Sequence, residues 1–142
     1  MKRHAEIYTD GACEPNPGPG GWGYVILEEE ETNVTGSGGN LDTTNNQMEL
    51  TAVIEALNQF EEPISATILS DSQYVVNGIN IWLNGWVKNN FKKGKVKNRD
   101  LWEQLLDYKR THDLVAVWVH SHVGIKYNER ADSLATYGMK CL

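Results

Sequence analysis

Ser65-Ala66-Thr67-Ile68-Leu69-Ser70-Asp71 is a short, largely apolar run that is followed at once by an acidic residue. Residues 5–13 have the same character, with Ile7 and Tyr8 leading into Asp10. Short apolar runs of this kind are typical of buried β-strands. If the two strands are neighbours in a sheet, their ends meet at one edge. Each strand then delivers a carboxylate to that edge.

The rest of the chain predicts three more strands and a set of helices around them. Apolar residues recur at helical spacing from Thr44 to about Glu61, and Pro63 ends that helix. The other elements are expected at 21–28 and 33–41 (strands), 72–87 (short helical pieces), 100–112 (helix), 114–120 (strand) and 128–139 (helix). The order β-β-β-α-β-α-α-α-β-α predicts an α/β fold, with a five-stranded mixed sheet and helices on its faces. Residues 1–142 are expected to form one domain.

The glycine-rich run Gly18–Gly23 is expected to form a turn after the first strand. It lacks the Gly-Lys-Ser/Thr ending of a phosphate-binding loop.

Charge is distributed unevenly along the chain. The net charge of −6 argues against a nucleic-acid partner at first sight. However, no Lys or Arg occurs between Arg3 and Lys88, and a basic segment without any acid follows. That basic segment contains Lys88, Lys92, Lys93, Lys95, Lys97 and Arg99. Local charge decides where a polyanion docks, so this segment is a candidate nucleic-acid contact.

Features that would indicate another compartment are missing from the sequence. It contains no apolar run long enough to span a bilayer, and Met1–His4 leads directly into a strand, so we expect neither membrane insertion nor a signal peptide. Cys13 and Cys141 make no disulfide framework. We therefore expect a cytoplasmic protein with reduced thiols, and a monomer.

Four carboxylates in separate segments are the candidate chemical groups: Asp10, Glu49, Asp71 and Asp132. A fold that gathers them needs cations, and oxygen-only ligands favour Mg²⁺ or Mn²⁺ over zinc. Two such ions are the machinery of phosphodiester hydrolysis. Glu129 lies one helical turn before Asp132, and spacing alone does not choose between them. His120 and His122 have the spacing of a zinc half-site, but they lack a set of cysteine or histidine partners.

These segments resemble type I ribonuclease H from residue 5 to about residue 137. The matching motifs are Asp10-Gly11, Asn16–Gly21, Thr44–Leu50, Asp71–Tyr74, Val96–Trp102 and Asn128–Asp132. The resemblance implies the ribonuclease H-like fold. It also implies an endonuclease that hydrolyses the RNA strand of RNA–DNA hybrids and leaves 5′-phosphate and 3′-hydroxyl ends.

The resemblance assigns roles to the acidic residues and selects Asp132 over Glu129. It implies that Asp10 bridges two Mg²⁺ ions, for which Mn²⁺ can substitute. It further implies that Glu49 and Asp71 hold the second ion, and Asp132 the first. His122 falls on the family's mobile active-site loop, where a group that titrates near neutral pH aids proton transfer or product departure.

Amide side chains beside the catalytic segments are candidates for reading the substrate: Asn16, Asn45, Asn46 and Gln73. They could serve only as turn and cap residues, as Thr44 could cap the first helix. They could also contact 2′-hydroxyls in the wide minor groove of the hybrid, which would distinguish RNA from DNA without reading bases. The family's counterparts of these four residues do so.

The segment at about 82–99 resembles the handle with which the family grips the DNA strand. Trp82, Trp86 and the lysines of the basic segment would contact its sugar–phosphate backbone. Core packing is the alternative for the tryptophans. It is preferred for Trp102, whereas Trp82 is expected to be partly buried and Trp86 exposed. Thr44 and Asn98 match a pocket for a DNA phosphate.

Two other functions are compatible with parts of this pattern. One is a module that binds hybrids without cutting them, although such a module would be expected to have lost one of the four carboxylates. The other is a different metal-dependent nuclease of the same fold, such as a DNA resolvase or an exonuclease. The handle and the pair Asn45-Asn46 argue against it.

Overall fold

The computed structural model describes residues 3–28, 32–90, 92, 95–120 and 126–142. The strands are β1 (Arg3–Cys13), β2 (Gly18–Glu28), β3 (Thr32–Thr43), β4 (Ile64–Ser70) and β5 (Asp113–Trp118). The helices are α1 (Asn45–Leu57), α2 (Gln73–Asn77), the π-helix η1 (Gly78–Trp82), α3 (Leu83–Lys88), α5 (Arg99–Thr111) and α6 (Lys126–Lys140). Within the described residues, none of the helices has the length and apolarity needed to cross a membrane.

The five strands form one mixed sheet in the order β3-β2-β1-β4-β5. β1 pairs antiparallel with β2, and β2 antiparallel with β3, whereas β1 pairs parallel with β4, and β4 parallel with β5. The predicted mixed five-stranded sheet is therefore confirmed. So is the neighbouring position of the two strands that end near Asp10 and Asp71.

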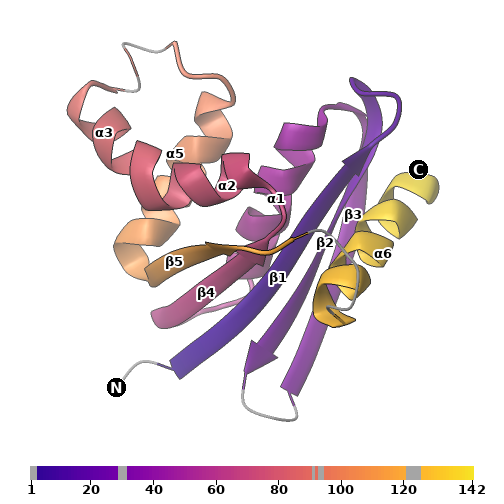
Figure 1. The fold of residues 1–142 in the computed structure, drawn as a ribbon, viewed down its shortest axis with the longest axis horizontal. Coiled ribbons are helices and arrows are strands. Elements are labelled where there is room, and N and C mark those ends of the chain that lie inside the picture. The colour runs from indigo at the N-terminus through magenta and orange to yellow at the C-terminus, as the bar shows by residue number, and fades with distance from the viewer. Residues whose placement is uncertain (1–2, 29–31, 91, 93–94, 121–125) are drawn as a thin grey trace.

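Helices cover both faces of this sheet. α1 and α5 lie together against one face, and α6 crosses the other over β1, β2 and β3 (Figure 1). α1 is buried along most of its length, and Leu50, Val53 and Leu57 are fully enclosed. Trp102 of α5 is also completely buried, as its predicted core role requires. Burial of such side chains contributes about 1.5–3 kcal/mol each.

The glycine-rich run is mostly strand, so the predicted turn is wrong in extent. β2 begins at Gly18 rather than at residue 21. A Cβ on Gly21 or Gly23 would overlap the backbone of α6, and a Cβ on Gly138 of α6 would overlap the carbonyl group of Gly38 in β3. These glycines form a seam along which α6 approaches the sheet backbone directly. They are present for their small size rather than for turning the chain.

The helices before and after β4 differ in extent and type from those expected. α1 ends at Leu57 rather than near Glu61, and the pieces predicted at 72–87 are α2, η1 and α3. In η1, Gly78 lies so close to the ring of Trp102 that a Cβ would overlap it. Nearby, the side chain of Lys109 donates a hydrogen bond to the carbonyl of Ile79. This bond ties the side chain of α5 to the backbone of η1.

Asn80 of η1 covers part of the outer edge of β5. Its Nδ2 donates to the carbonyl oxygen of Ala116 at 2.8 Å, and its Oδ1 accepts from the N–H of Ala116 at 2.9 Å. The side-chain amide thus makes the pair of hydrogen bonds that a neighbouring strand would make. Edge strands with unpaired backbone groups are templates for unwanted pairing.

Candidate active site

Asp10 and Asp71 come from the parallel strand pair in the middle of the sheet. The ladder between β1 and β4 runs as far as the pair Tyr8–Leu69. Asp10 and Asp71 lie just beyond that last pair. The side chain of Asp10 is 4% exposed, and that of Asp71 is half-buried. The sequence therefore folds two carboxylates to the same end of the sheet, as the strand pattern predicted.

Glu49 enters the same space from the first turns of α1. The N–H of Gly11 donates a hydrogen bond of 2.5 Å to Glu49 Oε1. Gly11 has to be a glycine, because a Cβ there would overlap the backbone nitrogen of Glu49. The side chain is 3% exposed, and its Oε2 atom is buried without a hydrogen-bond partner among the described residues. An ionised oxygen in that position needs a positive partner.

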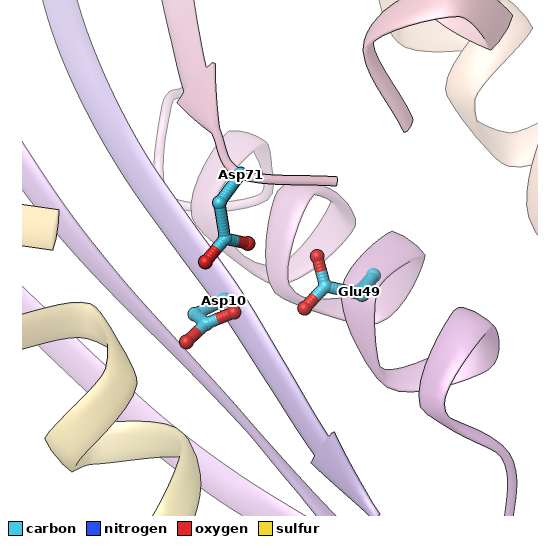
Figure 2. A group of neighbouring side chains, drawn as sticks. All are labelled: Asp10, Glu49 and Asp71. Carbon is cyan, nitrogen blue, oxygen red and sulfur yellow. The ribbon is translucent and has the colours of Figure 1, made fainter. Parts of the chain in front are cut away.

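The three side chains form one compact acidic cluster. Figure 2 shows the carboxylates of Asp10, Glu49 and Asp71 pointing toward one another. One ligand oxygen from each lies within 4.8 Å of the others. Such a group of like charges is unfavourable in a protein interior unless protons or cations neutralise it.

The same cluster raises the pKa of its buried members. Burial is the largest cause for Asp10, and the negative charge of Glu49 raises its pKa further. Burial also raises the pKa of Glu49, and the charge of Asp71 adds to this effect. Hydrogen bonds from Asp10 and from the Gly11 N–H partly oppose the shift at Glu49. Without a cation, the pair Asp10–Glu49 therefore holds a proton well above the normal range of carboxyl groups.

Asp132, rather than Glu129, lies beside this cluster. The charge of Asp132 contributes to the raised pKa of Glu49, and its side chain also helps to raise the pKa of Asp10. Glu129 is exposed and lines a separate cavity of about 580 Å³ next to Lys126. Of the two acids that spacing left open, Asp132 is the one whose side chain acts on the cluster, and its role as a metal ligand stays a prediction.

The donor set fits divalent oxygen-seeking cations. All of the gathered side chains are carboxylates, and a buried carboxylate oxygen without a partner points to a missing positive charge. Zinc sites normally use cysteine or histidine, and neither belongs to the group of metal-ligating side chains found among the described residues. Carboxylate oxygens suit Mg²⁺ and Mn²⁺.

Most of the predicted polar residues line a single cavity near this cluster. The cavity has a volume of about 500 Å³, and its lining residues are Asn16, Thr44, Asn45, Asn46, Gln47, Lys97 and Asn98. Thr44 caps α1 as predicted, and its hydroxyl accepts a hydrogen bond from the N–H of Gln47. Asn16 accepts from the N–H of Asn45 at 3.1 Å. Gln73 is exposed at the start of α2 and does not line this cavity.

Gln47 is a member of this cavity that the sequence interpretation missed. It follows directly after Asn45-Asn46, so a third amide in the same run was the available signal. A glutamine inside a helix is ordinarily solvated, and only the fold shows that this one faces another segment.

The aromatic residues of the predicted handle form a packed group. Trp86 lies 5.3 Å from Trp102 and 5.8 Å from Trp82, measured between ring centroids. Trp86 is half-buried, so the expectation that it is exposed has to be corrected. Trp82 is half-buried as expected, and its ring meets that of Tyr74 edge to face. Packing against buried Trp102 is the physical reason for the reduced exposure of Trp86.

The lysines of the basic segment that the structure describes are all exposed: Lys88, Lys92, Lys95 and Lys97. The N–H of Lys95 bonds to the carbonyl of Lys92 at 3.3 Å. Lys93 and His122 lie outside the described residues.

Comparison with known proteins agrees with this architecture. The sequence profile of the RNase H family matches residues 2–140. The chain belongs to the RNase H family. Ribonuclease H of Mesorhizobium japonicum is 49% identical over 142 residues, covering 98% of this chain and 80% of that protein. Ribonuclease H of Dechloromonas aromatica is 50% identical over 139 residues, covering 95% and 93%. These relatives identify the chain as a nuclease, and hence a hydrolase.

Solved structures of RNase H proteins have the same fold. LC9-RNase H1, a type 1 RNase H with the type 2 active-site motif, matches with a TM-score of 0.89 and 25% identity, covering 99% of this chain and 74% of that one. LC11-RNase H1, solved in complex with RNA/DNA hybrid, matches with a TM-score of 0.74 and 25% identity, covering 96% and 97%. The RNase H-like α/β fold expected from the sequence is therefore confirmed.

Proposed function

We propose that this chain is an endonuclease that hydrolyses the RNA strand of RNA–DNA hybrids in a reaction that depends on two divalent cations. The products would be 5′-phosphate and 3′-hydroxyl ends. Mg²⁺ is the proposed cofactor, and Mn²⁺ is the proposed substitute. The observation that carries this proposal is the group formed by buried Asp10, buried Glu49 and half-buried Asp71, with Asp132 close enough to influence the pKa values of Asp10 and Glu49.

The acidic residues would hold the cations at the end of β1 and β4. Asp10 would be the ligand shared by the two ions, since the side chains of Glu49 and Asp132 both act on its pKa. When bound, the two ions lower the pKa of a reacting water and stabilise charge on the leaving oxygen. The protein's own part is to keep the four carboxylates together at one end of the sheet, with Gly11 donating its backbone N–H to Glu49.

The amides that neighbour the acidic residues in sequence would recognise the hybrid. Asn16, Asn45 and Asn46 line the same cavity, and Gln73 lies exposed two residues after Asp71. Amide side chains both donate and accept hydrogen bonds, as the 2′-hydroxyl of RNA does. This contact would favour an RNA strand at the acidic cluster, whatever its base sequence. The complex of LC11-RNase H1 with RNA/DNA hybrid supports this choice of substrate.

The DNA strand would contact the cavity and the basic segment. Thr44 and Asn98, with Lys97 beside them, would bind one phosphate of that strand in the cavity of about 500 Å³. The exposed lysines Lys88, Lys92 and Lys95 would add phosphate contacts, together with Lys93. Trp82 and Trp86 would offer their exposed parts to deoxyribose, which lacks a 2′-hydroxyl and therefore allows a ring to approach closely.

His122 completes the proposed machinery through the family resemblance. A histidine titrates near neutral pH, which suits proton transfer at the reacting phosphate or departure of the product. The proposal also includes a monomeric enzyme that works in the cytoplasm.

One assay separates this function from its rivals. End-labelled RNA–DNA hybrid, double-stranded RNA and double-stranded DNA are each incubated with Mg²⁺, Mn²⁺ or a chelator. We expect internal cleavage of the RNA strand of the hybrid with either ion and none with chelator. Hybrid binding without cleavage would support the non-catalytic module instead. Cleavage of double-stranded DNA would support another nuclease of this fold.

A further inference from the structure

A chain of side-chain hydrogen bonds runs through the wall of the proposed phosphate cavity. Thr43 Oγ1 donates to Gln47 Oε1 at 2.9 Å, and Gln47 Nε2 donates to Asn98 Oδ1 at 3.2 Å. Asn98 Nδ2 then donates to the hydroxyl of Tyr74 at 3.1 Å. The buried indole of Trp102 donates to the same hydroxyl at 2.9 Å. The chain links β3, α1 and α2 to the start of α5.

Gln47 and Asn98 meet amide to amide, so the orientation of one amide fixes that of the other. A Tyr hydroxyl can donate or accept, so Tyr74 alone would accept either end of that amide. Gln47 presents an NH₂ group, which can bond only to the carbonyl end of Asn98. The NH₂ group of Asn98 is thereby turned away from α1. Tyr74 takes one of its two hydrogens, and the second can serve a ligand.

The backbone conformation of Asn98 gives independent evidence that its side chain does not serve to cap α5. Asn98 is the N-cap of α5, a position where asparagine normally accepts a hydrogen bond from the helix N-terminus. Here its φ is 58°, in the left-handed region, and its side chain makes no cap hydrogen bond. The amide is committed instead to Gln47 and Tyr74, at the loss of a contact that typically stabilises a helix by about 1 kcal/mol.

The hydrogen bond between Gln47 and Asn98 also lies between two cavities. Both residues line the cavity of about 500 Å³ that includes Asn16, Thr44 and Lys97. Both also line a second cavity, of about 480 Å³, that includes Asn40 and Arg99. Changing Gln47 therefore alters the wall of the first cavity without changing Thr44 or Lys97, which would contact the phosphate directly.

We infer that Gln47 is a positioning residue that holds Asn98 with an N–H donor presented to a phosphodiester of the DNA strand. The inference rests on the proposed function for the identity of the substrate. A phosphate accepts hydrogen bonds and donates none at neutral pH, so a reversed Asn98 amide would offer it a repelling carbonyl oxygen. Because Gln47 lies on α1 two residues before Glu49, the same contact ties the phosphate cavity to the helix that carries a proposed metal ligand.

The first test uses two substitutions at Gln47 in steady-state cleavage of a hybrid. Gln47→Glu offers Asn98 only acceptor oxygens, so the Asn98 amide should turn over and KM should rise about 10- to 100-fold, the usual worth of a charge-assisted hydrogen bond. Gln47→Met removes the donor without adding charge, and KM should rise about 3- to 10-fold, the worth of a neutral hydrogen bond. In both variants kcat should stay within about twofold, because each metal ligand is intact.

Asn40→Asp is the matched control for charge. Asn40 lines the neighbouring cavity with Gln47, and its Oδ1 accepts a hydrogen bond from the N–H of Asp42, which an aspartate preserves. If Asn40→Asp raises KM as much as Gln47→Glu does, the effect is one of charge and the inference is wrong. An unchanged KM in Gln47→Met, or a fall in kcat with KM intact, would also overturn it.

The second test does not depend on cleavage. The side-chain NH₂ signals of Asn98 are followed by NMR while a short single-stranded oligodeoxythymidylate is added to the protein in chelator. We expect these signals to shift in the wild-type protein and to respond much less in Gln47→Met. Equal responses in the two proteins would refute the role of Gln47. If the wild-type protein fails to cut hybrid but the Asn98 response depends on Gln47, the proposed function falls and the positioning role stands.

Discussion

Replacing Asp10 by Asn should stabilise the protein in the absence of divalent cations. At 4.8 Å, the upper limit on the distances between the ligand oxygens of the cluster, Coulomb's law with an effective dielectric constant of about 20 gives roughly 3 kcal/mol for one pair of charges. Asp10 faces both Glu49 and Asp71, but a proton held by the cluster removes part of that repulsion. We therefore expect Asp10→Asn to raise the free energy of unfolding by about 2–4 kcal/mol near pH 8.

The pH dependence of this effect follows from the direction of the pKa shift. The pKa of Asp10 is higher in the folded protein than the ordinary value of about 3.9, which an unfolded chain retains. Such a group favours folding when it is protonated, below the unfolded pKa. That contribution is lost as the pH rises toward the folded pKa. The advantage of Asp10→Asn should therefore be small near pH 4 and grow with pH, and Glu49 adds to the trend because its pKa is raised too.

Thermal and urea unfolding at several pH values, each with chelator or Mg²⁺, measure the effect. In chelator at pH 8, the Tm of Asp10→Asn should exceed that of the wild type by roughly 5–10 °C. Mg²⁺ should raise the Tm of the wild type more than that of the variant, because a cation that binds only the folded state stabilises it. Exposed Asp42→Asn is the control and should change little. A destabilised Asp10→Asn, or a difference that does not vary with pH, would refute the electrostatic account of the cluster.

Four further outcomes concern activity. Asp71→Asn should reduce cleavage in Mg²⁺ by more than about 100-fold, which exceeds the 10- to 100-fold loss typical of residues that only support a metal ligand. Hybrid binding in a gel-shift assay should stay near normal. Near-normal cleavage would contradict the two-ion proposal. Ca²⁺ should support hybrid binding without turnover, because it prefers longer oxygen distances than Mg²⁺, and equal cleavage rates in the two ions would disprove this. Replacing four lysines of the basic segment together by alanine (Lys92, Lys93, Lys95 and Lys97) should lower the magnitude of the slope of log affinity against log salt by about 1–3, and kcat should be retained. An unchanged slope would mean that the segment is only a solvated loop. Trp86→Ala should raise KM with little change in the salt slope. Because the ring packs on Trp102, the substitution should also lower the free energy of unfolding by about 1–3 kcal/mol. Full stability in urea would argue against the observed packing.

The sequence predicted the parts of the fold and of the site that depend on local patterns. Apolar runs ending at Asp10 and Asp71 predicted strands, and the structure pairs those strands in parallel. It also predicted the helix that carries Glu49, because apolar residues recur there at helical spacing. Alternation and periodicity reflect which faces are buried, so they are visible without knowledge of distant contacts.

The errors came from contacts between segments far apart in the chain. In sequence, a glycine needed for its small size looks the same as a glycine needed for a turn, so the run Gly18–Gly23 was predicted to turn although it begins β2 and α6 packs against its Gly21 and Gly23. Trp86 lies next to lysines in sequence, which suggested exposure, but Trp102 packs against it from α5. Gln47 was overlooked because its partner Asn98 is 51 residues away.

The side chain of Asn80 makes the two hydrogen bonds that one residue of a sixth strand would make with β5. Its amide occupies the N–H and carbonyl of Ala116 on the outward edge of β5, where the chain also exposes Val115 and Val117. A second molecule approaching that edge would have to displace a side chain that is already bonded at the middle of the strand. The residue that helps to anchor η1 therefore also covers backbone groups through which β5 could pair with a strand of a second molecule, which disfavours self-association of the protein at high concentration.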